Sequence, residues 1–148
     1  MTVDLVLLPR ILPRTAPTAA PVATAGTTTI EALTALLREP ASAFLKTVLL
    51  RSAEGVVAVV LPGDREASAP TLRKLLGVSA LRFAGDADFA AAGGVAGYVG
   101  PGGLHARTLV DVSVERRPYV AGANRAETHL RGVLLGRDFD GERADVHD

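Results

Sequence analysis

Apolar and polar residues recur along the chain in patterns that predict regular structure from Thr28 onward. Over 30–37, apolar residues return at the three- and four-residue spacing of one helical face. The inward-facing residues would be Ile30, Leu33, Leu36 and Leu37. Thr28 and Glu31 have the spacing of a capping box, in which each side chain satisfies a free backbone N–H at the helix start. Pro40 should end the helix, because the residue before a proline disfavours helical backbone angles.

A β-hairpin is predicted next. The segments 47–52 and 56–61 are rich in Val and Leu, and the turn residues 53–55 separate them. Further elements are expected as a helix over 69–76 ending at Gly77, a strand over 81–83, a helix over 86–92, and strands over 108–112, 119–121 and 133–135. Helices and strands alternate without a strict repeat. We therefore expect an α/β domain with a single mixed β-sheet flanked by helices.

The two ends of the chain differ from this patterned part. Residues 1–27 place prolines at four-residue spacing among Ala and Thr, which is typical of an extended arm or linker because proline fixes φ and removes a donor. Residues 140–148 are polar and are expected to fray. The predicted domain therefore covers 28–139.

Composition narrows the possible functions. The chain has 148 residues, of which 48% are hydrophobic and 22% charged, so it forms one globular domain with a genuine core. Cysteine is absent, which excludes disulfides, thiolate metal sites and a cysteine nucleophile. The formal net charge is zero, which argues against strong unaided binding to nucleic acid. No apolar run has the length of a membrane span, and we expect a cytoplasmic protein.

Single residues give weak chemical signals. His105, His129 and His147 lack the spacing of a metal site, and no serine stands in a GxSxG motif. Lys46, one of two lysines, precedes the first strand and on spacing alone is a solvated charge more often than a functional group.

Two glycine-bearing segments carry more information. The loop 93–103 is either a flexible surface loop or a concavity whose N–H groups bind an oxyanion, and it lacks the Gly-Lys-Ser/Thr of a P-loop. In 121–139, Asn124 can occupy a left-handed turn, five residues before His129. A turn, a core histidine and a surface Arg–Asp pair would explain this second segment equally well.

The order of four motifs resembles a known family. GAN-x4-H at 122–129 with GRDF at 136–139 is similar to the insertion (editing) domain of bacterial prolyl-tRNA synthetases, within the wider YbaK-type aminoacyl-tRNA deacylases. TIEALTALL at 29–37, FLKTVLL at 44–50 and GYVGPGGL at 97–104 agree in order with that family. The resemblance implies a mixed sheet flanked by helices.

The resemblance also implies residue roles. Catalytic roles fall on Lys46, Gly100 and Gly102, and substrate-binding roles on Pro101, Asp111, Asn124 and His129. Lys46 would hold the 3′ end of the tRNA, the loop 93–103 would stabilise the oxyanion with its N–H groups, and His129 would line the amino-acid pocket. No cofactor or metal is implied.

The implied reaction is hydrolysis of alanine wrongly esterified to proline tRNA. The ester is already activated, so positioning of substrate and water matters more than a strong nucleophile. The partners would be aminoacylated tRNA and a prolyl-tRNA synthetase, with no membrane. Two alternatives stay open: an inactive module that binds tRNA ends or a synthetase, and a deacylase for another small residue such as cysteine or serine. The chain would be either a freestanding deacylase or an excised editing domain.

Overall fold

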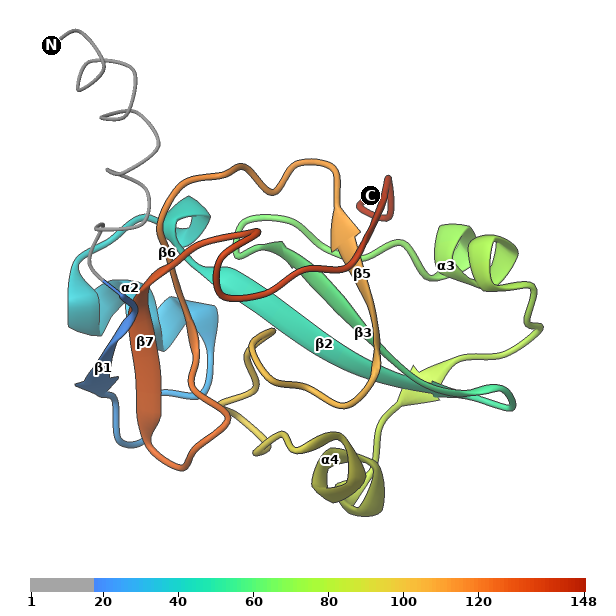
Figure 1. Cartoon of the computed structure of the whole chain (residues 1–148), viewed down its shortest axis with the longest axis horizontal. Helices are drawn as coiled ribbons and strands as arrows, with labels where there is room; N and C mark the ends of the chain where they lie inside the picture. The colour runs from blue at the N-terminus through green and yellow to red at the C-terminus, as the bar shows by residue number, and fades with distance from the viewer. Residues whose placement is uncertain (1–17) are drawn as a thin grey trace, which may run out of the picture.

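Regular structure begins before Thr28. The computed structural model describes residues 18–148, and β1 (Ala20–Ala23) pairs antiparallel with β7 (Thr128–Val133) (Figure 1). The expected start of ordered structure at Thr28 is therefore wrong. The partner of β1 lies more than a hundred residues along the chain, so no local pattern announces the pairing. Residues 1–17 of the expected arm lie outside the described residues.

The larger sheet is mixed, as the strand pattern predicts. Its order is β4-β2-β3-β5-β8, with β2–β3 and β2–β4 antiparallel and β3–β5 and β5–β8 parallel. The strands are β2 (Leu45–Ser52), β3 (Gly55–Pro62), β4 (Arg82–Phe83), β5 (Arg107–Asp111) and β8 (Glu142–Ala144). The predicted hairpin is the β2–β3 pair.

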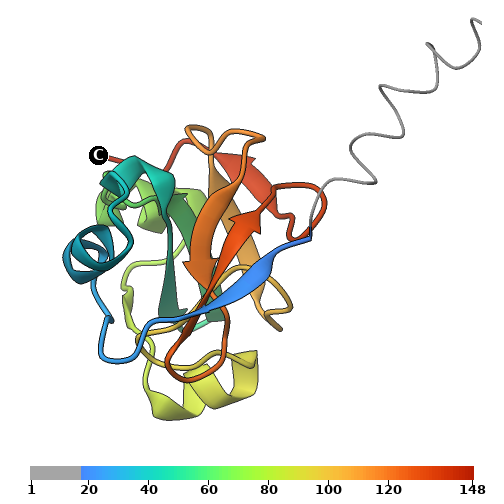
Figure 2. The same ribbon diagram turned by 90° about the vertical axis from the view of Figure 1, so that its left-hand side faces the viewer.

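A second, antiparallel sheet has the order β1-β7-β6 (Figure 2). Its strand β6 (Tyr119–Gly122) matches the predicted element, whereas β7 replaces the strand expected over 133–135. The strands are thus divided between two sheets, with His129 inside β7. Residues 45, 60 and 110 of the larger sheet pack against 119, 121 and 133 of the smaller one.

Two of the three α-helices within 18–148 have the predicted bounds. They are α3 (Ala69–Leu76), which ends at a left-handed Gly77, and α4 (Asp86–Ala92). The first helix, α2 (Ile30–Leu37), is capped one residue later than expected, because the Thr29 hydroxyl accepts from the Ala32 N–H at 3.1 Å. Leu36 is 49% exposed and so does not face inward as predicted.

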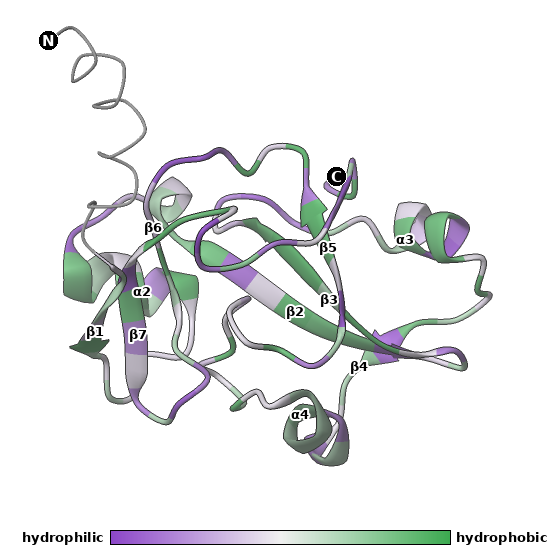
Figure 3. Ribbon diagram, in the orientation of Figure 1, coloured by the Kyte–Doolittle hydropathy of each residue, from purple (hydrophilic) through white to green (hydrophobic). Residues whose placement is uncertain are grey.

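Strand β3 is the centre of the core. Val59, Val60 and Leu61 on β3 have no exposed surface, and the strand is apolar along its length (Figure 3). Such a continuous apolar run is typical of a strand covered on both faces. Val59 and Leu61 pack toward Leu72 of α3, and Ala58 packs toward Ala92 of α4, so the two helices cover opposite faces of the hairpin.

The C-terminal segment is ordered, contrary to the expected fraying. Strand β8 pairs with β5, Val146 is fully buried, and its carbonyl accepts from the Ser68 N–H at 2.7 Å. Polar composition alone could not reveal the buried Val146 that anchors this segment. No helix within 18–148 is both long and apolar enough to cross a membrane.

Candidate functional site

A cavity of about 510 Å³ opens beside the edge of β2. Its volume lies in the range of small-ligand pockets, which runs from roughly 300 to 1,000 Å³. The cavity is lined by Thr28, Thr29, Ile30, Leu33, Leu45, Lys46, Thr47, Val48, Leu49, Phe83, Ala84, Phe89, Gly97, Val99, Gly122 and His129. All four motifs, namely the first helix, the lysine strand, the glycine loop and the histidine segment, therefore meet at one place although they are far apart in sequence.

The edge of β2 is open at this cavity because β4 is short. β4 pairs only with Leu50 and Arg51, and the next bond is from the Ala84 N–H to the Leu49 carbonyl at 3.0 Å. Between Lys46 and Val48, β2 has no strand partner within 18–148 on the side away from β3. Both side chains and backbone of this stretch therefore border the cavity.

His129 forms the buried end of the cavity. It is 5% exposed, its Nδ1 lies 2.6 Å from the Thr24 hydroxyl, and its ring meets that of Tyr98 edge-on with centroids 5.6 Å apart. Burial lowers the pKa of His129, so the imidazole is neutral at pH 7. Its Nε2 has no protein partner among the described residues. The ring thus presents a neutral polar edge to a ligand.

The Thr24–His129 pair has the separation of a nucleophile and its base, yet Thr24 cannot attack a substrate. Thr24 has no exposed surface and does not line the cavity. Its N–H donates to the Glu127 carbonyl at 2.9 Å, and the nearby Gly26 N–H donates to the Tyr98 hydroxyl at 3.1 Å. The segment after β1 therefore positions the imidazole and the tyrosine ring that stands against it.

Glycines let the loop 93–103 pack backbone against backbone. A Cβ on Gly100 would lie 1.7 Å from the Gly122 carbonyl oxygen, and one on Gly122 would lie 2.3 Å from the Val99 oxygen. Gly97 has φ +84°, and a Cβ there would lie 2.7 Å from the Thr28 side chain. Any side chain at these three positions would push the cavity wall out of place.

Asn124 fastens the glycine loop. Its φ of 55° confirms the predicted left-handed turn. Its Oδ1 accepts from the Gly100 N–H at 2.9 Å, and its Nδ2 donates to the carbonyls of Gly100 and Gly102 at 3.0 and 2.8 Å. Asn124 does not line the cavity. Asn124 therefore positions the glycine loop. Its predicted direct contact with substrate stays a prediction.

The three loop residues singled out from the sequence stand behind the cavity wall. Gly100, Pro101 and Gly102 do not line the cavity, and the Gly100 N–H already donates to Asn124. Gly97 and Val99 of the same loop do line it. Their N–H groups have no acceptor within the part of the chain that the structure describes. A spacing argument missed them because GPG is the more conspicuous part of the motif.

Lys46 lies at the rim of the cavity. Its ammonium is 2.9 Å from Glu66 Oε1, with side-chain exposures of 19% for the lysine and 80% for the glutamate. Because the Glu66 carboxylate is exposed to solvent, the pair contributes about 0–1 kcal/mol and the carboxylate is easily replaced. The Lys46 ammonium is therefore available to an anionic or carbonyl oxygen of a ligand.

Thr47 carries a buried hydroxyl with no partner. Its Oγ1 is the one side-chain polar atom in 18–148 that is both buried and without a hydrogen bond, and the residue lines the cavity. An unpaired buried hydroxyl costs roughly 1–3 kcal/mol, which a ligand that supplies a partner would recover. The sequence held no signal for this residue beyond its place after Lys46.

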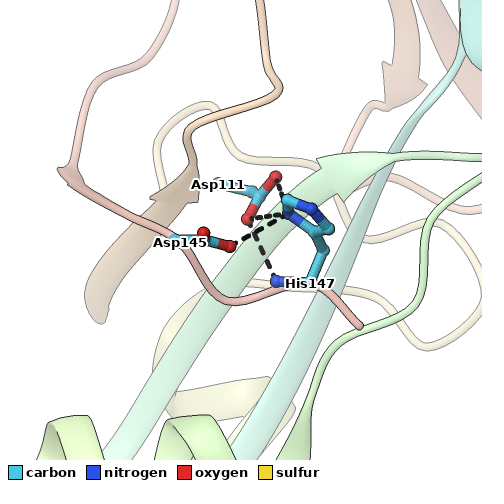
Figure 4. Close-up of side chains that lie close together, drawn as sticks. All are labelled: Asp111, Asp145 and His147. Atoms are coloured by element: carbon cyan, nitrogen blue, oxygen red, sulfur yellow. Dashed lines mark hydrogen bonds and ion pairs between the residues drawn. The ribbon is translucent and has the colours of Figure 1, made fainter.

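Asp111 lies away from the cavity and holds the C-terminal segment (Figure 4). Its carboxylate accepts from the N–H groups of Val146 and His147 at 2.9 and 3.1 Å, from the Ser113 hydroxyl, and from His147 Nδ1 at 2.9 Å. Burial alone would raise the pKa of Asp111, but these hydrogen bonds lower it to about 2. Asp111 does not contact the cavity, so the structure adds no support for its predicted substrate-binding role.

The trio of Asp111, Asp145 and His147 could be mistaken for a metal site. One ligand atom from each lies within 4.8 Å of the others. The Asp111 oxygens already accept the hydrogen bonds just described. These bonds to the C-terminal segment explain why the three side chains lie close together. We assign the trio a structural role.

The GRDF motif forms a turn after β7. Asp138 accepts from the Leu134 N–H at 2.8 Å and pairs with Arg137 at 2.9 Å, while Arg137 also donates to the Gly132 carbonyl at 2.7 Å. Phe139 is buried in the core between the sheets. The motif therefore shapes the return of the chain after β7.

The amino-acid sequence is similar both to a family model and to individual proteins of one kind. The family model for the aminoacyl-tRNA editing domain matches residues 24–139. A proline–tRNA ligase of Streptomyces avermitilis is 39% identical over 120 residues, which covers 79% of this chain and 21% of that protein. A proline–tRNA ligase of Nitratidesulfovibrio vulgaris is 39% identical over 119 residues, covering 78% and 21%. The chain thus spans about a fifth of the length of these relatives.

Solved structures share the fold. A candidate trans-editing enzyme for prolyl tRNA synthetase superposes with a TM-score of 0.71 at 16% identity, covering 99% of this chain and 94% of that chain. The hypothetical protein APE2540 superposes with a TM-score of 0.71 at 23% identity, covering 95% and 99%. At these identities the comparison establishes the architecture of the domain.

Thr47→Val should raise the free energy of unfolding by about 1 kcal/mol, because it replaces an unpaired buried hydroxyl with a methyl group of similar shape. Urea denaturation of both proteins measures the difference. Thr108→Val is the matched control, since the Thr108 hydroxyl donates to the Ala106 carbonyl at 3.1 Å and its loss should destabilise. Equal destabilisation by the two substitutions would contradict the assignment.

Asp111→Asn should lower the free energy of unfolding by about 2 kcal/mol at pH 7. The folded carboxyl has a pKa of about 2 against an ordinary value of 3.8, so its contribution is present above pH 4 and is lost as the pH falls toward 2. The denaturation curves of the two proteins should therefore differ at pH 7 and nearly coincide at pH 2. Asp140→Asn, at an exposed position, should change neither curve; a difference that persists at pH 2 would refute the mechanism.

Proposed function

The chain belongs to the aminoacyl-tRNA editing domain family, and from this premise we propose that it hydrolyses mischarged tRNA, with alanyl-tRNA(Pro) as the principal substrate. The observation that carries the proposal is the convergence of Lys46, His129 and the loop residues Gly97 and Val99 on one cavity. The similarity to proline–tRNA ligases supports proline tRNA as the nucleic acid and a prolyl-tRNA synthetase as the partner.

The reaction is attack of water on the ester carbonyl, followed by cleavage of its bond to the ribose oxygen, which takes up a proton. The N–H groups of Gly97 and Val99 supply donors for the oxyanion, because both residues line the cavity and neither N–H has a protein acceptor within 18–148. The proposed oxyanion contact therefore lies three residues earlier in the chain than the GPG motif suggested. The vicinal ribose hydroxyl orients the attacking water.

Lys46 holds the acceptor end of the tRNA. In the free protein its ammonium rests on the exposed Glu66 carboxylate. A phosphate or carbonyl oxygen of the substrate replaces that carboxylate, at little cost because the pair is weak. With a formal net charge of zero, the chain makes few phosphate contacts, so affinity for free tRNA is low and a synthetase or carrier delivers the substrate.

Selection takes place at the buried end of the cavity. His129 and its cross-strand partner Gly122 line this end, and a small aminoacyl side chain fits against them while proline is excluded by its ring. Such a second site is needed because an apolar synthetic pocket rejects a smaller residue by only about 10–200-fold. The cavity as a whole is much larger than an alanyl group, so it also accepts the attached nucleoside.

Serine is a second candidate side chain, and one observation favours it. Thr47 lines the cavity and its buried hydroxyl lacks a partner, so a rotation that turns this hydroxyl toward the cavity would let it bond to the hydroxyl of a seryl group. The assay therefore includes seryl- and cysteinyl-tRNA beside alanyl-tRNA.

The purified chain should hydrolyse alanyl-tRNA(Pro) and leave prolyl-tRNA(Pro) intact, because the buried end selects by size. Release of labelled amino acid from each substrate measures this. The cavity lining contains one imidazole and no carboxylate within 18–148, so hydrolysis of an alanylated minihelix should persist in EDTA. Equal hydrolysis of the two esters would refute the size selection, and no hydrolysis of any ester would indicate a binding module.

Lys46→Ala should lower kcat/KM for alanyl-tRNA(Pro) by roughly 10- to 100-fold, the loss of one hydrogen bond between charged groups. Thermal stability should change little, because the carboxylate that pairs with Lys46 is exposed and the ion pair is weak. Lys74→Ala is the control, since Lys74 is exposed on α3 and does not line the cavity. Comparable losses in both variants would mean that general positive charge explains the effect.

His129→Ala should change the ratio of rates on alanyl-, seryl- and prolyl-tRNA, with prolyl-tRNA gaining relative to alanyl-tRNA, because truncation enlarges the buried end. A general base would instead give a uniform loss of about a hundredfold or more. His129→Asn, which retains a polar group beside Thr24, separates the effect from misfolding, and thermal melting checks both variants. A uniform collapse with unchanged stability would assign proton transfer to His129.

A further inference from the structure

Phe83 is an exposed aromatic ring at the mouth of the cavity. Four large apolar residues in 18–148 have exposed side chains: Leu36 at 49%, Leu75 at 48%, Val112 at 50% and Phe83 at 78%. Of the four, Phe83 is the one that lines the cavity. An aromatic ring left in water beside a ligand site forgoes the stabilisation that burial gives other apolar side chains, and this points to a ligand that covers it.

The backbone that carries Phe83 is fixed although its ring is free. Phe83 pairs with Leu50 of β2, and the next residue, Ala84, donates its N–H to the Leu49 carbonyl at 3.0 Å. The Arg82 guanidinium donates to the Phe83 carbonyl at 3.2 Å. The ring therefore stands on a preorganised support, which lowers the entropy cost of binding a flat partner.

Phe83 shares a face of the sheet with Lys46. Side chains on a strand alternate between faces, so Lys46, Val48 and Leu50 point the same way, and Phe83 joins them as the direct cross-strand partner of Leu50. Lys46 and Leu50 are about 13 Å apart along the strand, at roughly 3.3 Å per residue. The rim thus offers a cation and an aromatic ring. Their separation is comparable to the length of a nucleoside together with its ester or phosphate group.

We propose that Phe83 is the stacking platform for the 3′-terminal adenine of the tRNA. This rests on the proposed function, because an aminoacyl group at His129 places its nucleoside over the open edge of β2, toward Lys46 and Phe83. Stacking suits a chain of zero net charge, which holds an RNA end with few phosphate contacts. Base–aromatic stacking is worth about 1–3 kcal/mol per base on alanine substitution, equivalent to roughly 5- to 150-fold in affinity.

The test uses an RNA minihelix whose terminal adenine is replaced by fluorescent 2-aminopurine and whose alanine is joined by a non-hydrolysable amide. Stacking on an aromatic ring quenches 2-aminopurine. Wild type and Phe83→Trp should quench the probe on binding, whereas Phe83→Leu, which keeps the apolar bulk, should bind about tenfold more weakly with the fluorescence largely retained. Leu75→Ala, at an exposed apolar position outside the cavity, should behave as wild type.

Hydrolysis of the ester-linked minihelix separates this proposal from the proposed function. Phe83→Leu should raise KM about tenfold with kcat nearly unchanged. If wild type quenches the probe but does not hydrolyse the ester, the proposed deacylase function is refuted and the proposed stacking on Phe83 still stands. Hydrolysis with equal KM and equal quenching in wild type and Phe83→Leu would overturn the stacking, and would indicate a surface for another protein. Circular dichroism should show a native fold for each variant, as the Phe83 side chain is exposed.

Discussion

Gly100 and Gly122 pass so close to each other that neither position admits a side-chain carbon, and the cavity depends on that contact. The contact joins the loop that leads into β5 of the large sheet to the end of β6 in the small sheet. The side-chain amide of Asn124 stabilises this contact with three hydrogen bonds, one that it accepts and two that it donates. Because the loop cannot move away from β6, its residues Gly97 and Val99 form a fixed wall facing β2.

The small sheet supplies the other half of the site, and it requires the segment at the start of the described chain. Thr24 follows β1 and holds the imidazole of His129, while Gly26 binds the hydroxyl of Tyr98. Both contacts are lost if β1 leaves the edge of β7. The part of the chain with the composition of a linker therefore stabilises the end of the cavity that contains His129.

The open edge of β2 gives the cavity its shape. An unpaired strand edge is usually a liability, since its free N–H and C=O groups invite pairing with another chain. Here β4 ends after Phe83, and the edge is bordered by α2 and the glycine loop instead of by a further strand. A ligand can consequently cross from the buried imidazole on one side to the lysine and phenylalanine on the other.

Sequence by itself determined the elements whose signals are local. The helix at Ala69–Leu76 is defined by its Ser68 cap and by Gly77, and the β2–β3 hairpin by two apolar runs about a short turn. Motif order also identified Lys46 and His129, which share the cavity. Tertiary structure alone decided the pairing of β1, the ordering of the C-terminal segment by Asp111, and the unpaired hydroxyl of Thr47. Periodicity and capping act over a few residues, whereas a strand partner, a buried acceptor or a missing hydrogen bond depends on which distant segments the packed chain brings together.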